Sequence, residues 1–160
     1  MALLEGSCHC GAARFSVRSH TPQPYMRCYC SICRKTAGGG GYAVNIMAEA
    51  ATLKLEGAEN ISVYRARGAH EGGEAPSPAR RHFCKHCGSA LYITDPRWPD
   101  RVYPFASAID TALPAPVERA HIMLEFKAPW VAVPAGEPCF ALYPDQSIED
   151  WHETRGLIEA

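Results

Sequence analysis

The spacing of the cysteines constrains this chain more than any other feature of its sequence. Seven of the eight cysteines fall into three short clusters, which are Cys8-His9-Cys10, the segment from Cys28 to Cys33, and Cys84-Lys85-His86-Cys87. In a reducing compartment, close grouping of this kind is typical of metal sites or catalytic thiols rather than of a disulfide framework. We therefore expect metal ions to organise part of the fold.

The first and third clusters each have the spacing of half a zinc site. In an extended chain, a C-x-C pair places both side chains on one face, and a C-x-x-C pair followed by glycine is typical of a zinc knuckle. Two halves complete a tetrahedron, so the economical prediction is one closed structural site made by Cys8, Cys10, Cys84 and Cys87. By analogy with zinc-finger peptides, such an ion contributes about 10–16 kcal/mol of apparent binding free energy.

The middle cluster offers three ligands, Cys28, Cys30 and Cys33. Three protein ligands with a fourth position left for water or substrate are typical of catalytic zinc. Two alternatives stay open: a thiol–disulfide role, and a closed site completed by one of His9, His82, His86, His121 and Cys139. We expect Cys139 itself to be a small buried apolar side chain, because free cysteine is among the most buried residue types.

Length and charge exclude several classes of protein. The chain has 160 residues, 47% of them hydrophobic, which is enough for one domain with a sizeable core. We expect a single domain over residues 1–160, with the motifs in about 6–138. The net charge of −1, without any long basic block, argues against a nucleic-acid partner. The absence of a cationic start and of a long apolar run predicts a cytoplasmic protein without a secretory signal or a membrane span.

The secondary-structure pattern predicts a mainly β fold. Short runs rich in β-branched and aromatic residues, separated by proline-rich turns, indicate strands at 13–18, 42–47, 52–57, 61–66, 90–94, 121–126 and 130–133. A short C-terminal helix is indicated by Ser147 as N-cap, Asp150 at the third helical position and Gly156 as a stop. A further helical turn is expected after Ser31. Residues 67–80 read as a mobile surface loop, or as a lid.

The order of these motifs resembles that of the glutathione-dependent formaldehyde-activating enzymes, whose domain also occurs in centromere protein V. The combination of all seven clustered cysteines is more specific than any one pair. The residues that carry the resemblance are Gly6, Cys8, Cys10 and Gly11, then Cys28, Cys30, Ser31, Cys33, Arg34 and Lys35 with the glycines at 38–41, then Phe83, Cys84, Cys87, Gly88 and Ser89, and finally His121, Ile122, Lys127 and Trp130.

The resemblance implies a β-tent fold built from small antiparallel sheets around zinc sites, with two zinc ions as cofactors. It implies a structural zinc on the first and third clusters and a second, more labile zinc on the triplet. It also implies a carbon–sulfur lyase that forms or cleaves S-hydroxymethylglutathione from glutathione and formaldehyde. Tyr29 departs from the family pattern, which often has histidine there, and the long loop at 67–79 is a second departure; both leave the thiol and carbonyl substrates open.

Further roles rest on charge and position. Three thiolates on Zn²⁺ leave a net charge of −1, so Arg34 and Lys35 are candidates to offset it and to hold the carboxylates of glutathione, unless they are only solvated surface cations. No motif selects a general acid among Tyr29, Tyr42, His121 and water. Two other classes of function remain, a zinc-stabilised protein-binding module and a thiol-based redox or metal sensor. The oligomeric state is open, a homodimer included.

Overall fold

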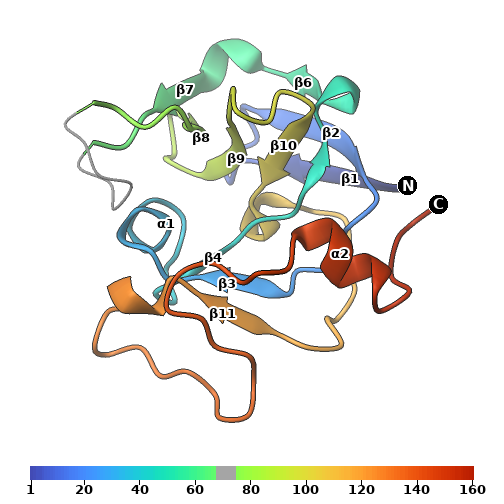
Figure 1. Cartoon of the computed structure of the whole chain (residues 1–160). Helices are drawn as coiled ribbons and strands as arrows, with labels where there is room; N and C mark the ends of the chain where they lie inside the picture. Colours follow the sequence, from blue (N-terminus) through green and yellow to red (C-terminus); the bar gives the residue numbers. More distant parts are fainter. Residues whose placement is uncertain (68–74) are drawn as a thin grey trace.

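The structure is a computed structural model that describes residues 1–67 and 75–160. Three small sheets make up most of the regular secondary structure (Figure 1), and they hold eleven strands among the described residues. The first sheet has the order β1-β2-β6, the second β5-β10-β9-β8-β7 and the third β11-β3-β4. The strands are β1 (Ala2–Ser7), β2 (Arg14–Ser19), β3 (Met26–Cys28), β4 (Ala43–Val44), β5 (Ala48–Glu49), β6 (Lys54–Glu56), β7 (Ile61–Tyr64), β8 (Arg80–Cys84), β9 (Ala90–Thr94), β10 (Arg101–Pro104) and β11 (Ala120–Ile122).

The first sheet is half-buried, as the alternation of its side chains requires. Phe15 and Val17 on β2 and Leu4 on β1 point into the core, while their neighbours face outward. Gly6 lies where β1 crosses the Phe15 ring: a Cβ there would come within 2.3 Å of Phe15 Cζ and 2.4 Å of the Ala108 carbonyl oxygen. This position therefore needs glycine. The first cysteine pair begins two residues later, directly after the end of β1.

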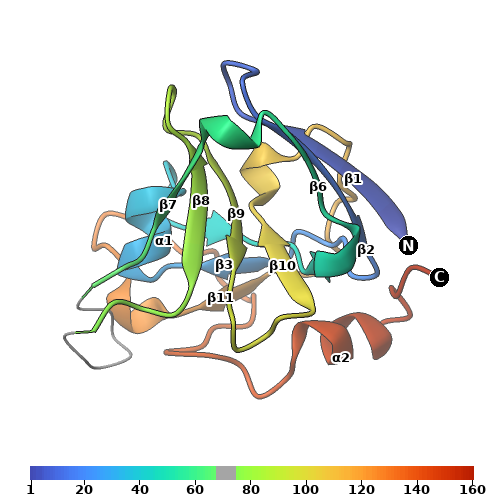
Figure 2. The ribbon, with the colours of Figure 1, turned by 90° about the horizontal axis from the view of Figure 1, so that it is seen from above.

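The second and third sheets carry the other two clusters. All pairs of the second sheet are antiparallel, and β8 ends at Cys84. The third sheet departs from the antiparallel expectation, because β3 and β11 pair in parallel, with Met26 opposite Ala120 and Cys28 opposite Ile122. Figure 2, turned by 90°, shows β7, β8, β9 and β10 side by side with the third sheet behind them. The sheets thus meet where the cysteines lie.

Two short helices complete the regular structure, α1 (Ser31–Thr36) and α2 (Ile148–Glu153). The predicted capping of α2 is confirmed: Ser147 Oγ accepts from the Asp150 backbone N–H, and Asp150 accepts in return from the Ser147 N–H. Trp151 of this helix stacks on Tyr25 with ring centroids 3.7 Å apart. Four single 3-10 turns are also present: η1 (Ala50–Thr52), η2 (Ala58–Asn60), η3 (Ala106–Ala108) and η4 (Leu124–Phe126). Among the described residues, no helix is long and apolar enough to cross a membrane.

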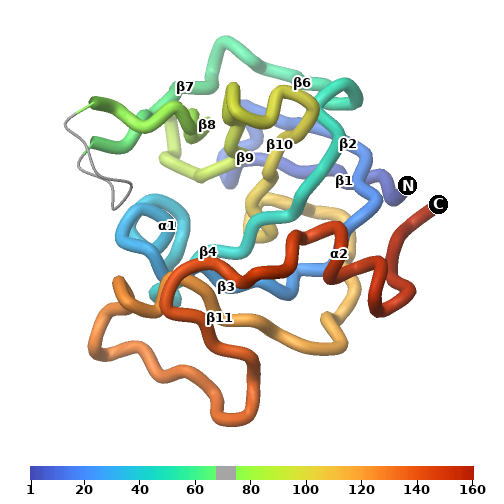
Figure 3. Tube along the Cα trace, viewed as in Figure 1, coloured from blue at the N-terminus to red at the C-terminus, as the bar shows by residue number. Residues whose placement is uncertain are grey.

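The C-terminal part of the chain wraps around the rest. In the tube view (Figure 3), the segment from β11 to α2 loops outward before α2 returns beside β3. The two termini lie close together in both ribbon views, and the Glu159 N–H donates to the His20 carbonyl, just beyond the strand that pairs with β1. This wrapping places the residues before α2 opposite the middle cysteine cluster.

The expected mainly β architecture is confirmed, and most of the expected strands are present. Strands lie within 13–18, 52–57, 61–66 and 90–94 or overlap them closely, but 42–47 holds only the short β4. The segment 121–126 leaves the sheet after Ile122, because Met123 adopts a left-handed φ of 60° and a 3-10 turn follows. The strand expected at 130–133 is wrong: this stretch is a turn and an irregular segment in which Trp130 is 70% exposed. Half of the loop expected at 67–80, residues 68–74, lies outside the described residues; residues 75–79 form no helix or strand, and Arg80 begins β8.

Candidate metal centres and the adjoining cavity

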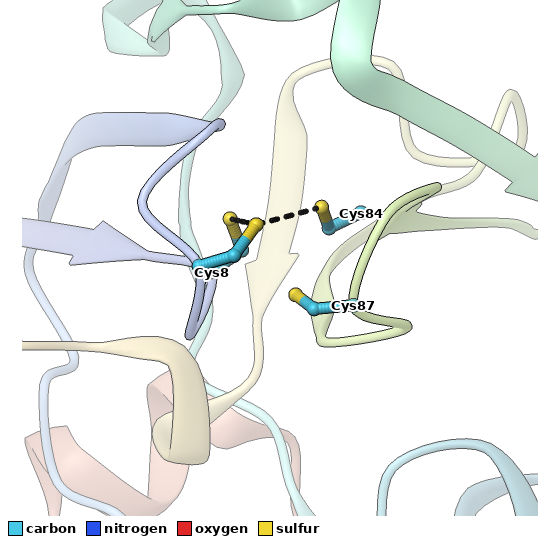
Figure 4. Close-up of side chains that lie close together, drawn as sticks. Cys8, Cys84 and Cys87 are labelled. Carbon is cyan, nitrogen blue, oxygen red and sulfur yellow. Dashed lines mark hydrogen bonds between the residues drawn. The ribbon is translucent and has the colours of Figure 1, made fainter.

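The first and third cysteine clusters come together as the sequence predicts. The sulfur atoms of Cys8, Cys10, Cys84 and Cys87 all lie within 4.8 Å of one another. Cys8 and Cys10 are 3.6 Å apart, and Cys10 and Cys84 are 3.7 Å apart, measured between Sγ atoms. Figure 4 shows Cys8, on the loop after β1, facing Cys84 at the end of β8 and Cys87 on the turn that follows. Four cysteine sulfurs that converge in this way can hold one metal ion.

Two tight turns give this cluster its shape. The Gly11 N–H donates to the Cys8 carbonyl and the Gly88 N–H to the Cys84 carbonyl, each over 2.9 Å. Gly88 has a φ of +74°, a left-handed conformation that glycine adopts without steric cost. The Ser89 hydroxyl, 3.2 Å from Cys87 Sγ, is the main cause that lowers the pKa of Cys87 to about 5. A thiolate at neutral pH is the form that binds a metal.

The middle cluster forms a separate three-sulfur group. Cys28 ends β3, Cys30 is the N-cap of α1, and Cys33 lies in the first turn of that helix. Their sulfur atoms lie within 4.8 Å of one another, and the Cys33 N–H donates to Cys30 Sγ over 3.3 Å. All three side chains are buried. The three sulfurs are therefore brought together because the end of β3 leads almost directly into the N-terminus of α1.

The three thiols of this middle cluster influence one another strongly. Hydrogen bonds from Cys28 and Cys33 lower the pKa of Cys30 to about 2. The pKa of Cys28 is raised instead, mainly by the hydrogen bonds that Cys28 makes to Cys30 and Cys33. The three sulfurs thus favour one negative charge and oppose three when no cation balances them. A divalent cation removes this conflict, so the donor set fits a thiophilic metal such as zinc.

Among the described residues, no histidine, carboxylate or further cysteine completes the middle cluster. The histidines considered as a fourth ligand bond other groups instead: His82 contacts Thr94, His86 contacts Asn60, and His121 contacts Tyr29 and Glu137. His9 is exposed and follows Cys8, so it lies at the other cluster. The middle cluster is therefore a group of three.

Cys139 belongs to neither cluster, and the expectation that it is buried is wrong. It is exposed, and its Sγ contacts the Glu137 carbonyl oxygen over 3.4 Å. Cys139 forms one isolated parallel bridge with His121 at the edge of the third sheet. At such an edge a side chain can face solvent, so the usual preference of free cysteine for burial does not apply.

A cavity of about 670 Å³ opens beside the middle cluster, with Cys28, Cys30 and Cys33 in its wall. Most of the other lining is apolar, from β3, α1, β9, β10 and β11, and includes Met26, Ile32, Ile93, Tyr103 and Ile122. The residues from Tyr143 to Ile148 form another wall. A mostly apolar cavity with a few polar groups is the usual form of a small-molecule site. Cys8, Cys10, Cys84 and Cys87 are not among the lining residues.

Two arginines line this cavity, and they differ in how their charge is balanced. Arg97 forms a two-pronged ion pair with Asp95, with Nε 3.0 Å from Oδ1 and Nη2 2.7 Å from Oδ2. Burial alone would raise the pKa of Asp95, but hydrogen bonds from Arg97 outweigh it and hold this pKa below its ordinary value. Arg81, on β8, instead places Nη2 3.6 Å from Cys33 Sγ.

The sequence did not single out Arg81 or Arg97, and it favoured two other cations. Arg34 and Lys35 lie on α1 directly after Cys33, but neither is among the residues that line the cavity. Lys35 is exposed, while Arg34 is half-buried with its Nε unbonded. The register of β8 against β9, with Arg81 opposite Ile93, brings Arg81 to the cluster, and no local sequence signal encodes that pairing.

The three residues considered as general acids lie together behind the cluster rather than in the cavity. The Tyr29 hydroxyl is 2.7 Å from His121 Nδ1, and His121 Nε2 is 2.6 Å from Glu137 Oε2. Tyr42 packs against Tyr29, with ring centroids 5.3 Å apart. None of these residues is among those that line the cavity. Since neighbouring residues in an extended segment face opposite ways, the inward Cys28 and Cys30 leave Tyr29 on the far side.

The fold and the two cysteine groups define a class, that of small mainly β proteins with two cysteine groups that could each hold a metal ion, one of them beside a ligand-sized cavity. Comparison with known proteins makes this specific. The glutathione-dependent formaldehyde-activating enzyme family matches residues 3–123, and the chain belongs to this family.

One relative and one solved structure support the assignment. A protein of Halomonas elongata, which carries the provisional name of a glutathione-dependent formaldehyde-activating enzyme, is 58% identical over 159 residues, covering 98% of this chain and 99% of the relative. The crystal structure of a Rhodobacter sphaeroides protein superposes with a TM-score of 0.53 at 27% identity, covering 69% of this chain and 91% of that one. The mainly β architecture is thus shared with a solved structure.

Proposed function

We propose that this chain catalyses the reversible addition of the glutathione thiol to formaldehyde, which makes it a carbon–sulfur lyase in the cleavage direction. The observation that carries the proposal is the placement of the three-cysteine group in the wall of a cavity of about 670 Å³. The four-cysteine group does not line this cavity. Family membership supports the same reaction at the level of the family.

Each cysteine group has its own role in this proposal. Cys28, Cys30 and Cys33 hold one zinc ion, and the four-cysteine group holds another that acts structurally. An ion held by three thiolates supplies positive charge that favours the thiolate form of an incoming thiol. The four-cysteine site links the loop after β1 to the turn after β8, which are far apart in sequence, so its part is to fix the sheets around the cavity.

The reaction forms one C–S bond, breaks the π bond of the carbonyl and moves one proton from sulfur to oxygen. An electron pair of the substrate sulfur forms the C–S bond with the formaldehyde carbon, and the π pair of the C=O bond moves onto the oxygen. That oxygen takes up a proton from water, which replaces the proton lost by the thiol. The product is S-hydroxymethylglutathione, and the reverse sequence breaks the same C–S bond. The apolar wall of Ile93, Tyr103 and Ile122 limits water around these atoms.

Arg34 and Lys35 remain proposed anchors for the carboxylates of glutathione. The support for this role is their place on α1 directly after Cys33, although neither lines the cavity. Charge reversal at both positions tests this role. If the affinity for glutathione is unchanged in the double variant Arg34→Glu, Lys35→Glu, the anchoring role is discarded while the proposed reaction still stands.

The reaction is tested by measuring how fast glutathione and formaldehyde exchange with their adduct, by NMR, above the spontaneous rate. The zinc-loaded protein is expected to accelerate exchange, and Cys30→Ser is expected to abolish the acceleration. Cys139→Ser is the matched control, because Cys139 is exposed and outside both groups, and it should behave as wild type. No acceleration by the wild-type protein would contradict the proposal and favour a binding module or a metal sensor.

A further inference from the structure

Among the described residues, one arginine of the cavity wall, Arg81, has no carboxylate partner. Arg81 forms no ion pair with any carboxylate of residues 1–67 and 75–160, whereas Arg97 is neutralised by Asp95. Its Nη1 is buried and has no hydrogen-bond partner among these residues. A buried donor without a partner costs free energy, so a protein that retains one usually has a use for it.

The position of Arg81 relates it directly to the reacting atoms. Its Nη2 contacts Cys33 Sγ over 3.6 Å, and its side chain lines the same cavity as the three sulfurs. In the proposed reaction, negative charge develops on an oxygen only two bonds away from the substrate sulfur. The carboxylates of glutathione are several bonds more distant from that sulfur. A guanidinium in contact with the cluster is therefore better placed for the developing oxygen than for a carboxylate.

We propose that Arg81 is the oxyanion-binding residue of this site, an inference that rests on the proposed function. As the C–S bond forms and the C=O electron pair moves to oxygen, the guanidinium donates a hydrogen bond to that oxygen and offsets its charge. Arginine stays protonated, so the proton that completes the hydroxyl group comes from water. Because the surrounding wall is mostly apolar, the interaction acts with little screening.

The test compares Arg81→Met with Arg81→Lys in the zinc-loaded full chain, with Arg80→Met as the matched control. Arg80 is the neighbouring residue on β8, is exposed and does not line the cavity. Loss of one oxyanion donor typically lowers kcat about 10²- to 10³-fold, so Arg81→Met is expected to lose roughly 10²-fold in kcat. Its KM for glutathione should stay within about threefold, and Arg80→Met should match wild type.

A binding measurement gives a second readout that does not depend on turnover. S-carboxymethylglutathione places an anionic group one carbon from the sulfur, where S-propylglutathione has only methylene and methyl groups. By calorimetry, the wild-type protein is expected to prefer the charged analogue about tenfold, since one charged contact is worth about 1.4 kcal/mol or more. Arg81→Met should lose this preference and Arg81→Lys should keep it. Zinc content and thermal melting of each variant check that the fold is intact.

The outcomes separate this inference from the proposed function. If the wild-type protein does not accelerate the exchange, both fall together. If it does, and Arg81→Met keeps wild-type kcat, the inference alone is overturned. A variant that loses glutathione affinity with unchanged kcat would show Arg81 to be a carboxylate anchor, which also overturns it. If Arg81→Met folds poorly, Arg81→Lys, which keeps the positive charge, provides the test. If Arg81→Lys no longer prefers S-carboxymethylglutathione over S-propylglutathione, the inference is contradicted.

Discussion

Tyr29 and His121 meet inside the protein, with the Tyr29 hydroxyl 2.7 Å from His121 Nδ1 although 92 residues separate them in the sequence. Both side chains are fully buried. The carboxylate of Glu137 can only accept, so His121 Nε2 donates to it, and in the neutral imidazole Nδ1 accepts from the Tyr29 hydroxyl. Since Tyr29 lies between two cysteines of the triplet, this chain of hydrogen bonds fixes the backbone of the site from behind.

Removing the Tyr29 hydroxyl should therefore destabilise the fold. Tyr29→Phe leaves His121 Nδ1 buried without a partner, which typically costs about 1–3 kcal/mol. Urea unfolding of the zinc-loaded protein measures the change. Tyr64→Phe is the matched control, because Tyr64 is 45% exposed on β7, and it should change the free energy of unfolding by less than about 0.5 kcal/mol. Equal stability of the two variants would contradict the structural role given to the Tyr29 hydroxyl.

Loss of a ligand from the four-cysteine site should unfold much of the protein. Cys84→Ser removes a fully buried sulfur at the end of β8, one of the four proposed ligands that connect this strand to the loop after β1. We expect one zinc fewer per chain and a large drop in melting temperature, because binding of a structural ion is coupled to folding. Zinc analysis and calorimetry measure both. The same drop in Cys139→Ser, whose sulfur lies outside both groups, would show a general effect of thiol loss instead.

Gly6 should tolerate no side chain. In Gly6→Ala the new Cβ would lie within 2.4 Å of the Ala108 carbonyl oxygen, a backbone atom that cannot move alone. Overpacking of this kind typically costs about 1–3 kcal/mol. Gly39→Ala is the control, since a Cβ at Gly39 meets nothing within 4 Å. Chemical denaturation of both variants tests the close approach; a Gly6→Ala protein as stable as wild type would show that β1 and η3 can separate at no cost.

The stability of the C-terminal helix should fall in mild acid because of His152. This buried imidazole is held neutral: Nδ1 donates to the Ile148 carbonyl over 2.7 Å, and Nε2 accepts from the Gln23 N–H over 3.2 Å. Burial is the main cause that lowers the pKa of His152 below its ordinary 6.5. The unfolded chain therefore binds a proton near pH 6.5 that the folded chain does not, and the contribution present above that pH is lost as the pH falls below it.

The check on His152 is the slope of the free energy of unfolding between pH 7.5 and pH 5.5, chosen to bracket the ordinary histidine pKa of about 6.5. His152→Gln cannot take up this proton, so its slope should be shallower than that of the wild-type protein. The comparison of the two proteins cancels the titration of all other groups. Identical slopes would mean that His152 binds its proton equally well in the folded and unfolded chains.

The sequence predicts the two cysteine groups well because the spacing of the cysteines within each cluster is local information. Two residues between Cys84 and Cys87, one between Cys8 and Cys10, and a glycine at 88 are enough to shape a turn around an ion. The cap formed by Ser147 and Asp150 is local in the same sense. Each of these features could be identified before any knowledge of which strands pair.

The remaining features depend on contacts between distant segments. Strands as short as β3 and β4 have too few residues to show an alternating pattern of apolar and polar side chains. The parallel pairing of β3 with β11 therefore cannot be recognised from the sequence. The same holds for the approach of Arg81 to Cys33, which follows from the register of β8. Likewise, only the fold reveals that His121 is the hydrogen-bond partner of Tyr29.

The most direct test of the account is X-ray absorption at the zinc edge, before and after glutathione is added, on protein purified without added metal. We predict two zinc ions per chain, one with four sulfur ligands and one with three sulfurs and a lighter atom, and a gain of one sulfur ligand at the second upon addition of glutathione. Cys30→Ser should retain one zinc ion, and the number of sulfur ligands of that ion should not change when glutathione is added. Two ions already bound by complete sets of protein ligands, and unchanged by glutathione, would contradict the proposed thiol-binding centre.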